Sequence, residues 1–296
     1  MTARPLQFPV RLLGREFSLE DMALIGRLVA AHQAQGRAAI SRELARALHW
    51  YQPNGRLKDM TARTLLLRLH RAGLIELPPP KSSNGNGRLH PAFSPASDPA
   101  FPVDLPVHDL GPLQFHPASG ATPIARLWRE FVDRYHYLGH RRILGPQIRY
   151  LVGSSHGWLA ALGFGGAAWK VGPRDRWIGW TPALREQRLP LVVNNVRFLV
   201  LPWVRSKNLA SHLLATAARR LPQDWQARYN VRPLILETFV ESQRFRGTCY
   251  KAANWIHVGA TQGRGKMDRF AQRLLPVKDI FLLPLHRDAR RLLCAP

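Results

Sequence analysis

The stretch Leu201–Leu214, LPWVRSKNLASHLL, constrains the fold of this chain more than any other segment. The apolar run Val192–Leu201 before it has the character of a strand and ends at Pro202. A short basic turn, 205–208, then opens directly into an amphipathic helix. Such a turn aims free backbone N–H groups and the positive end of a helix dipole at one point, where a pyrophosphate could bind. The segment therefore predicts an α/β domain with an anion-binding turn.

This turn resembles the acyl-CoA motif of the GNAT acyltransferases, R-x-x-G-x-G/A, with Arg205, Asn208 and Ala210 at the marked positions. Asn208 replaces a glycine, and asparagine is the other residue that best tolerates a left-handed backbone. The resemblance implies acetyl-CoA or another acyl-CoA as cofactor, with its pyrophosphate in the turn and its pantetheine arm along the strand. The implied cofactor-binding residues are Leu199, Leu201, Arg205, Ser206, Lys207, Asn208, Leu209, Ala210 and Ser211.

Two later segments follow in the GNAT order. PLILETFV, residues 233–240, indicates a buried strand with Glu237 in its middle, and residues 247–259 resemble the fourth GNAT helix and the strand after it. A carboxylate inside a buried strand has a raised pKa, so Glu237 is the candidate general base; the alternative is a salt bridge with an arginine. The resemblance implies that Tyr250 lies near the thioester sulfur and protonates the leaving thiolate; the alternative is a tyrosine that caps the core.

Composition narrows the class of protein. The 296 residues contain no apolar run of about 18 residues, so we expect no membrane partner. The N-terminus lacks the pattern of a signal peptide, and the two cysteines, Cys249 and Cys294, exclude a disulfide scaffold and a cysteine-rich zinc site. His136 and His140 lack the glutamate of an HExxH motif, so we expect no metal. These features predict a protein of the bacterial cytoplasm.

The charge balance indicates a polyanionic partner. Forty-three basic residues, most of them arginine, stand against 19 acidic ones and give a formal net charge of +24. Genome composition can explain arginine over lysine but not basic over acidic residues. The excess is present in both halves of the chain. We therefore expect DNA as a partner.

Residues 1–77 predict a small helical DNA-binding domain. Helices are expected over 22–33, from Ser41 to about Trp50, and over 59–72, followed by a strand at 74–77. This order resembles a winged helix-turn-helix. On the third helix Ala62, Leu65, Leu66 and Leu69 share one face, and the basic and hydroxyl residues predicted to contact DNA are Arg63, Thr64, Arg68 and Arg71. The alternative is a solvated helix face in a small bundle.

Residues 78–105, rich in proline, glycine and serine, predict a linker, and residues 106–296 predict the α/β domain. In that domain we expect a helix over 124–135, strands over 147–152 and 158–164, and a polar loop around 173–176. The strand over 192–201, a helix over 209–221, the strand near 234–240, a helix over 247–254 and a final strand follow. The predicted fold class is α/β (α+β): a winged-helix-like domain, a linker and a GNAT-like mixed sheet flanked by helices.

Four separated runs within residues 127–286 resemble, in order, the DruA family of the Druantia anti-phage defence system. They begin YHYLGHRRILGPQ, VVNNVRFLVLPWV, LETFVESQRFRG and PVKDIFLLPLH. The resemblance implies a DNA-associated bacterial protein that acts in phage defence or mobile-element biology, beside other defence-system or transposase proteins. It implies no particular chemistry.

Two functions therefore remain open. The first is an acyl-CoA-dependent acyltransferase that acts on a nucleic acid or a bound protein. The second is a non-catalytic DNA-binding factor in defence or transposition whose GNAT-like scaffold has no cofactor. The retained Tyr250 favours the first, and Asn208 in place of glycine favours the second. The glycine-rich segment 259–266 predicts a basic loop that brings Arg264 and Lys266 close to phosphate.

Overall fold

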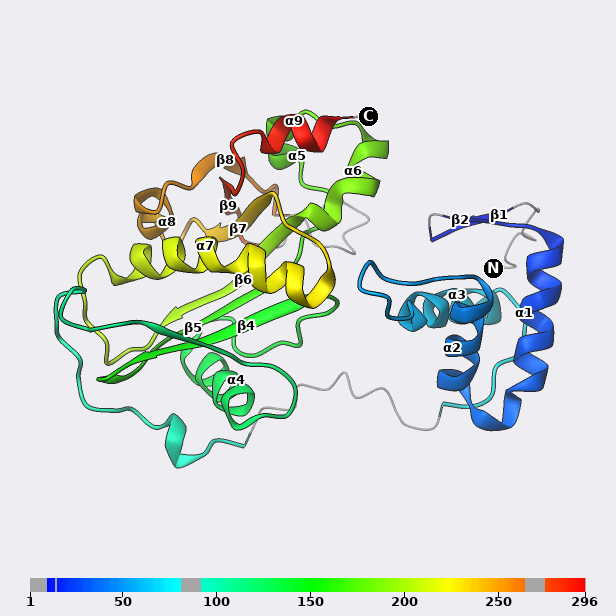
Figure 1. The fold of residues 1–296 in the computed structure, drawn as a ribbon, viewed down its shortest axis with the longest axis horizontal. Coiled ribbons are helices and arrows are strands. Elements are labelled where there is room, and N and C mark those ends of the chain that lie inside the picture. Colours follow the sequence, from blue (N-terminus) through cyan, green and yellow to red (C-terminus); the bar gives the residue numbers. More distant parts are fainter. Residues whose placement is uncertain (1–9, 14, 81–91, 264–274, 296) are drawn as a thin grey trace. The chain divides into compact units, whose positions relative to one another are not determined.

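The computed structural model describes residues 10–13, 15–80, 92–263 and 275–295 (Figure 1). The chain divides into two compact units, residues 1–87 and 88–296, and the division falls inside the predicted linker. In the ranges described, no helix combines the length and apolar character needed to cross a bilayer.

The first unit contains a β-hairpin and three helices. Strands β1 (Val10–Leu12) and β2 (Arg15–Phe17) pair antiparallel, and α1 (Leu19–Ala31), α2 (Arg37–Ala47) and α3 (Asp59–Arg71) follow, with a 3-10 turn, η1 (Gln33–Gln35), after α1. Ser18 caps α1: Asp21 N donates to Ser18 Oγ at 3.2 Å, and Ser18 N donates to Asp21 Oδ2 at 2.9 Å. The apolar face predicted for α3 is buried.

Three details of this unit differ from the sequence prediction. The helix expected from Ser41 begins at Arg37, because Gly36, with φ of 90°, already turns the chain. The hairpin β1–β2 was not expected. The prediction of a strand over 74–77 is wrong: among the described residues this segment pairs with no strand, and Leu77 N donates instead to His70 Nδ1 at 3.4 Å. The winged-helix assignment stays a prediction.

The second unit is built on a seven-stranded mixed sheet in the order β3-β4-β5-β6-β7-β9-β8. The strands are β3 (Gln114–Pro117), β4 (Gln147–Ser154), β5 (Gly157–Gly166), β6 (Val192–Val200), β7 (Ile235–Glu241), β8 (Ile256–Ala260) and β9 (Lys278–Pro284). Every neighbouring pair is antiparallel except β6 and β7, which run parallel.

Helices cover both faces of this sheet. Helix α4 (Pro123–Tyr135) lies on one face, and α7 (Leu209–Tyr229) lies on the opposite face beside α8 (Thr248–Ala252) (Figure 1). The shorter elements are η2 (Pro95–Ser97), α5 (Gly172–Ile178), α6 (Pro182–Arg188), η3 (Leu189–Leu191) and α9 (Ala289–Cys294). Fully buried Trp128 of α4 donates its Nε1–H to Leu162 O at 2.9 Å and so fixes α4 to β5.

The helix and strand order of the second unit matches the prediction, but several elements differ. The polar loop expected around 173–176 is helix α5, and β3, α6 and β9 were not expected. Helix α7 continues through Pro222 to Tyr229, because the turns beyond the proline are well anchored: Trp225 is buried, and the Tyr229 hydroxyl donates to Gln147 O at 2.8 Å.

The last part of the predicted linker is also packed rather than free. Val103 pairs with Val204, and its N–H donates to Trp203 O at 2.9 Å. Ser94 donates from its N–H and its hydroxyl to Glu130 Oε2. Proline-rich composition excludes regular structure here, but it does not exclude docking of an extended chain.

Gly247, just before α8, gives a test of the packing. Its φ is 65°, and a Cβ there would lie 2.6 Å from Cζ of buried Phe281. Gly120 has a φ of 63° with nothing within 4 Å of the same position. Both alanine variants incur about 1–2 kcal/mol of backbone strain, and Gly247→Ala should lose clearly more stability in urea unfolding because of the added clash. Equal losses would show that Phe281 moves aside freely.

Candidate functional site

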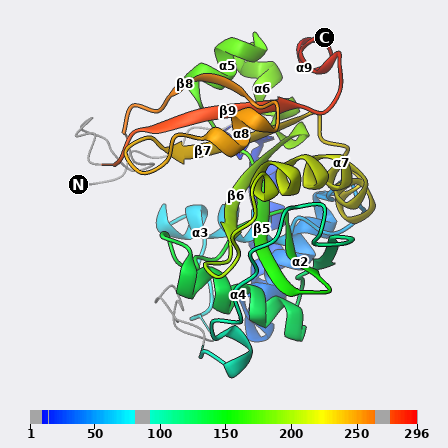
Figure 2. The same ribbon diagram turned by 90° about the vertical axis from the view of Figure 1, so that its left-hand side faces the viewer.

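A cleft opens where β6 and β7 separate. The two strands pair only from Val192↔Ile235 to Asn194↔Glu237, and each then continues without the other. In Figure 2, β7 and β9 run across the view while β5 and β6 turn away from them. The cleft has a volume of about 690 Å³. Its lining residues are Tyr135, His136, Tyr137, Leu138, Asn195, Val196, Phe198, Leu199, Val200, Thr238, Phe239, Val240, Arg244, Phe245, Arg246, Gly247, Thr248, Cys249 and Tyr250.

Asn195 is the polar centre of this cleft. A β-bulge lies at this point of β6, because Phe164 pairs with Asn195 whereas Gly163 pairs with Arg197. The buried Asn195 amide donates to Gly163 O at 3.1 Å and to Arg197 O at 3.0 Å, and its Oδ1 accepts from the Tyr250 hydroxyl at 2.8 Å. With both ends bonded, the amide has one fixed orientation.

Tyr250 projects from α8 onto the same spot. Its ring packs against Phe281 and Trp255. Tyr250 therefore also caps the core, the alternative that the sequence left open. Burial raises the pKa of the Tyr250 hydroxyl well above its usual value, which keeps the group protonated. The hydroxyl therefore carries a proton, but its raised pKa makes it a weaker acid than an exposed tyrosine.

Two loops meet at the mouth of the cleft. Tyr137, after α4, lies with its ring centroid 5.3 Å from that of Phe245, after β7. The Arg244 guanidinium lies 4.8 Å from the Tyr137 centroid, and His136 stacks on Tyr137 at 4.8 Å. Burial, with Arg197 nearby, lowers the pKa of His136 to about 4. His136 is therefore neutral near pH 7, and its Nδ1 accepts from Leu138 N at 3.2 Å.

The predicted pyrophosphate turn precedes α7 as expected. Asn208 has φ of 66°, which confirms the left-handed geometry predicted for the residue in the glycine position. Arg205 and Lys207 are exposed, whereas the Ser206 hydroxyl is buried without a hydrogen-bond partner. The backbone N–H of Arg205 is not free to bind a phosphate, because it donates to Val103 O at 2.8 Å.

The other predicted cofactor residues fall in different surroundings. Leu199 lines the cleft beside Tyr250, whereas Leu201 and Leu209 are buried in the core. Ala210 and Ser211 are half-buried in the first turn of α7. The structure thus brings Leu199 and Tyr250 together in the cleft and keeps the turn, 205–211, outside its lining.

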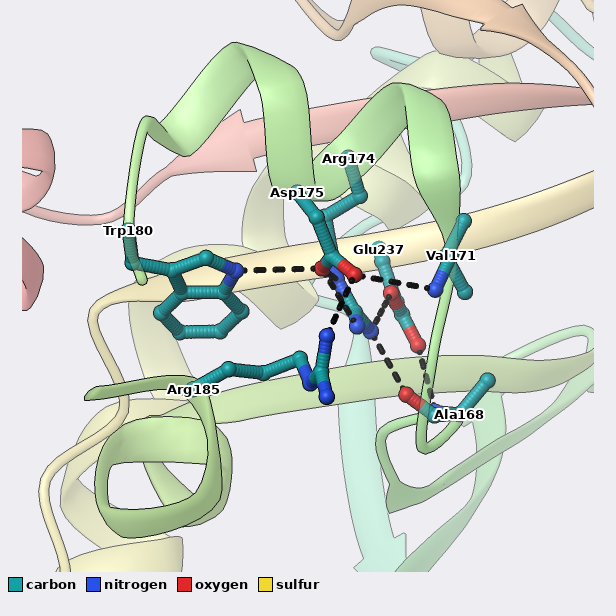
Figure 3. Close-up of polar contacts among 7 residues, drawn as sticks. All are labelled: Ala168, Val171, Arg174, Asp175, Trp180, Arg185 and Glu237. Carbon is teal, nitrogen blue, oxygen red and sulfur yellow. Dashed lines mark hydrogen bonds and ion pairs between the residues drawn. The ribbon is translucent and has the colours of Figure 1, made fainter. Parts of the chain in front are cut away.

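Glu237 lies in a buried charge network rather than in the cleft (Figure 3). Its Oε2 accepts from Arg174 Nη1 at 2.9 Å, its Oε1 accepts from Ala168 N at 2.9 Å, and both charged side chains are fully buried. Burial raises the pKa of Glu237, and Arg174 opposes that effect. The structure therefore favours the salt bridge over the general base, because the carboxylate has no path to a substrate.

The same arginine connects α5 to this network. Arg174 donates from Nε and Nη2 to Asp175 Oδ1 at 2.9 and 2.8 Å, and Trp180 Nε1 donates to the same oxygen at 3.1 Å (Figure 3). Arg185 Nη1 lies 3.6 Å from Asp175 Oδ2. Two arginines thus balance two carboxylates and fix the insertion α5–α6 to β7.

On α3, three of the four residues predicted to contact DNA are exposed. Thr64, Arg68 and Arg71 are open to solvent, whereas Arg63 is half-buried with its Nε enclosed. Arg264 and Lys266 lie outside the described residues. Over the ranges that the structure covers, no three His, Cys, Asp or Glu side chains gather as a metal site.

Several residues of the site had no clear signal in the sequence. Asn195 and Arg174 act through partners far along the chain, Tyr250 and Glu237 respectively. One signal was present: Asn194 and Asn195 interrupt an otherwise apolar strand, and a polar residue in a buried strand requires a partner.

The arrangement of elements defines the class of protein. A helix, antiparallel strands, and then strand, helix, strand, helix and strand, with a parallel pair that separates, form a GNAT-like core. The chain belongs to the family of Druantia protein DruA, whose model matches residues 121–274, more than half of its length. It is thus a defence-associated protein with a GNAT-like core, as the sequence resemblance predicted. No curated protein matches the chain.

Several solved acetyltransferases are structurally similar. One is a GNAT acetyltransferase from Bacillus cereus ATCC 10987, at 13% identity and a TM-score of 0.29, over 47% of this chain and 71% of that one. A putative acetyltransferase from Salmonella typhimurium with acetyl-CoA has 15% identity and a TM-score of 0.30, over 48% and 66%. Aminoglycoside acetyltransferase AAC(6')-Ib with coenzyme A has 14% identity and a TM-score of 0.35, over 61% and 96%.

The charge network generates a stability prediction. Arg174→Met leaves the buried Glu237 carboxylate without its cation and should cost about 3–5 kcal/mol in urea unfolding. A carboxyl whose pKa is higher in the folded than in the unfolded state binds its proton more tightly when folded. The loss should therefore be smaller in acid and grow as the pH rises through the unfolded pKa.

Two further variants complete this test. Arg174→Met with Glu237→Gln should remove the pH dependence, because no buried carboxyl remains at that position. Arg291→Met, which breaks a pair whose arginine is 75% exposed, should change stability by about 0.5 kcal/mol or less. A loss for Arg174→Met that is equally small at every pH would contradict the network.

Proposed function

We propose that the second unit binds an acyl-CoA in the cleft and transfers the acyl group to an amine of a nucleic acid or of a bound protein. The separation of β6 and β7 after Asn194 and Glu237 carries the proposal. It leaves an edge of β6 at Leu199 for an extended ligand arm to lie along, in a cleft of about 690 Å³. Cofactor sites occupy roughly 300–1,000 Å³.

The turn before α7 fits a pyrophosphate. The left-handed Asn208 leads into a helix that runs from Leu209 to Tyr229, so its N-terminal dipole favours an anion. The enclosed Ser206 hydroxyl has no hydrogen-bond partner, and a phosphate oxygen there would accept its proton. Exposed Arg205 and Lys207 add two positive charges. These residues would hold the pyrophosphate, while Leu199 and Val200 border the pantetheine arm.

A bound acyl-CoA would supply the thioester. In the transfer, the amine nitrogen bonds to the acyl carbon, the carbon–sulfur bond breaks, the amine loses a proton and the thiolate gains one. Tyr250 is our candidate for the acid, because its hydroxyl lies in the lining of the cleft; it would give its proton to the thiolate and regain one from the attacking amine. Asn195 positions that hydroxyl through its Oδ1.

Thermal unfolding with acetyl-CoA tests the binding step. At a hundredfold excess over the dissociation constant the wild-type chain should gain about 2.7 kcal/mol. Ala210→Glu should abolish this gain, because it adds bulk and negative charge to the first turn of α7. Ala227→Glu, at an exposed position on the same helix, should leave the gain intact.

Tyr250→Phe separates binding from transfer. It removes only a hydroxyl, so the CoA-dependent gain should persist while acyl transfer falls about 100-fold. If no CoA thioester stabilises the wild-type chain, the cofactor-free scaffold replaces the enzyme as the better hypothesis.

DNA binding by the first unit is a second candidate function. The exposed face of α3 that carries Thr64, Arg68 and Arg71 supports it, together with the net charge of +24. Arg68 and Arg71 are both exposed, so a phosphate could reach their guanidinium groups.

A salt titration of duplex-DNA binding tests this candidate. Arg68→Ala with Arg71→Ala should weaken binding and lower the slope of log K against log salt by about two, because each arginine would neutralise one phosphate. Arg46→Ala, on α2 and paired with Glu43, is the matched control and should change the slope little. An unchanged slope in the double variant would show that α3 faces solvent rather than DNA.

A further inference from the structure

The mouth of the cleft has a charge pattern that selects its ligand. Arg244 and Arg246 are exposed in its lining, and Arg197 lies close enough to affect the pKa of Tyr137 and of His136. Among the lining residues there is no aspartate or glutamate. Glu241, at the end of β7, is near Tyr137 but outside the lining. The mouth is therefore positive and favours an anionic ligand over an ammonium.

The same mouth offers planar surfaces. Phe245 is 46% exposed although it is a large apolar ring. The Arg244 guanidinium lies 4.8 Å from the Tyr137 centroid and 6.0 Å from that of Phe245, so it stacks between the two loops. Exposed aromatic rings and arginine planes are the groups on which proteins stack unpaired bases.

The protonation states of the groups in and near the cleft favour a nucleobase over a lysine side chain as the acceptor. A lysine ammonium must lose a proton before it can attack a thioester, and this requires a base. None of the described residues that line the cleft is an aspartate or glutamate, Glu237 is paired with Arg174, and burial lowers the pKa of His136 to about 4. The exocyclic amino group of a nucleobase is uncharged at neutral pH and reaches the cleft without that step.

We propose that Tyr137, Arg244, Phe245 and Arg246 form a binding site for single-stranded nucleic acid, which presents an unpaired base to the cleft. The base stacks on Phe245 and on the Arg244 plane, and Arg246 pairs with a flanking phosphate. That this base is the acyl acceptor rests on the proposed function. The binding itself does not require the cofactor.

A single-stranded oligonucleotide that contains 2-aminopurine tests the site, because the emission of this base falls when it stacks. The full-length chain is used with excess unlabelled duplex DNA, which occupies the predicted site on α3. Wild type should quench the emission. Phe245→Ala and Arg244→Gln should each weaken binding about tenfold. Phe101→Ala, at a ring that is 92% exposed elsewhere in the unit, should bind like wild type.

Acetyl-CoA stabilisation, measured on the same variants, separates the two proposals. Phe245→Ala and Arg244→Gln should reduce the CoA-dependent gain far less than Ala210→Glu does, since both variants leave intact the turn before α7 and Leu199 and Val200, which border the proposed pantetheine arm. If CoA binds but wild type does not quench 2-aminopurine, or if both variants quench like wild type, the nucleic-acid site is wrong and the acyl-CoA site stands. If quenching follows the variants but no CoA thioester binds, the base-binding site stands and the acyl transfer fails.

Discussion

The short parallel contact between β6 and β7 governs the second unit. Antiparallel ladders bind the strands on either side along most of their length, whereas this pair holds together only up to Asn194 and Glu237. The sheet thus consists of two firmly bonded halves that meet at a narrow contact. Glu237 belongs to the last residue pair between β6 and β7, and Arg174 forms an ion pair with it. The charge network therefore stabilises the point from which the cleft opens. Every group in the cleft depends on the angle between the two halves.

Patterns local in sequence predicted much of the fold. The apolar periodicity of α3 and α4, the strands β4 to β7, and the left-handed turn at Asn208 each follow from neighbouring residues. Two of the elements that were missed, α5 and β9, depend on distant partners. Arg174 of α5 forms an ion pair with Glu237 of β7, and β9 pairs between strands that precede it in the chain. A sequence window contains neither partner.

In the candidate site, too, features formed by consecutive residues were predicted, whereas contacts between distant residues were not. The turn before α7 could be located because its chemistry lies in consecutive residues. Tyr250, singled out from its motif, lines the cleft, whereas its hydrogen-bond partner Asn195 comes from a distant strand, β6. Glu237 shows the opposite error: a buried carboxylate suggests a base, and only the position of Arg174 shows that its charge is already balanced.

The position of β9 affects how this protein is made. Strand β8 pairs only with β9 within the sheet described, and β9 follows it in the chain. During synthesis, the edges of β7 and β8 that pair with β9 therefore stay unpaired until Pro284 has left the ribosome and β9 can insert between them. Until then the nascent chain exposes unpaired strand edges, the feature that chaperones protect and that aggregation exploits. A translational pause or truncation before β9 would leave β8 without a pairing partner in the sheet described and one edge of β7 unpaired.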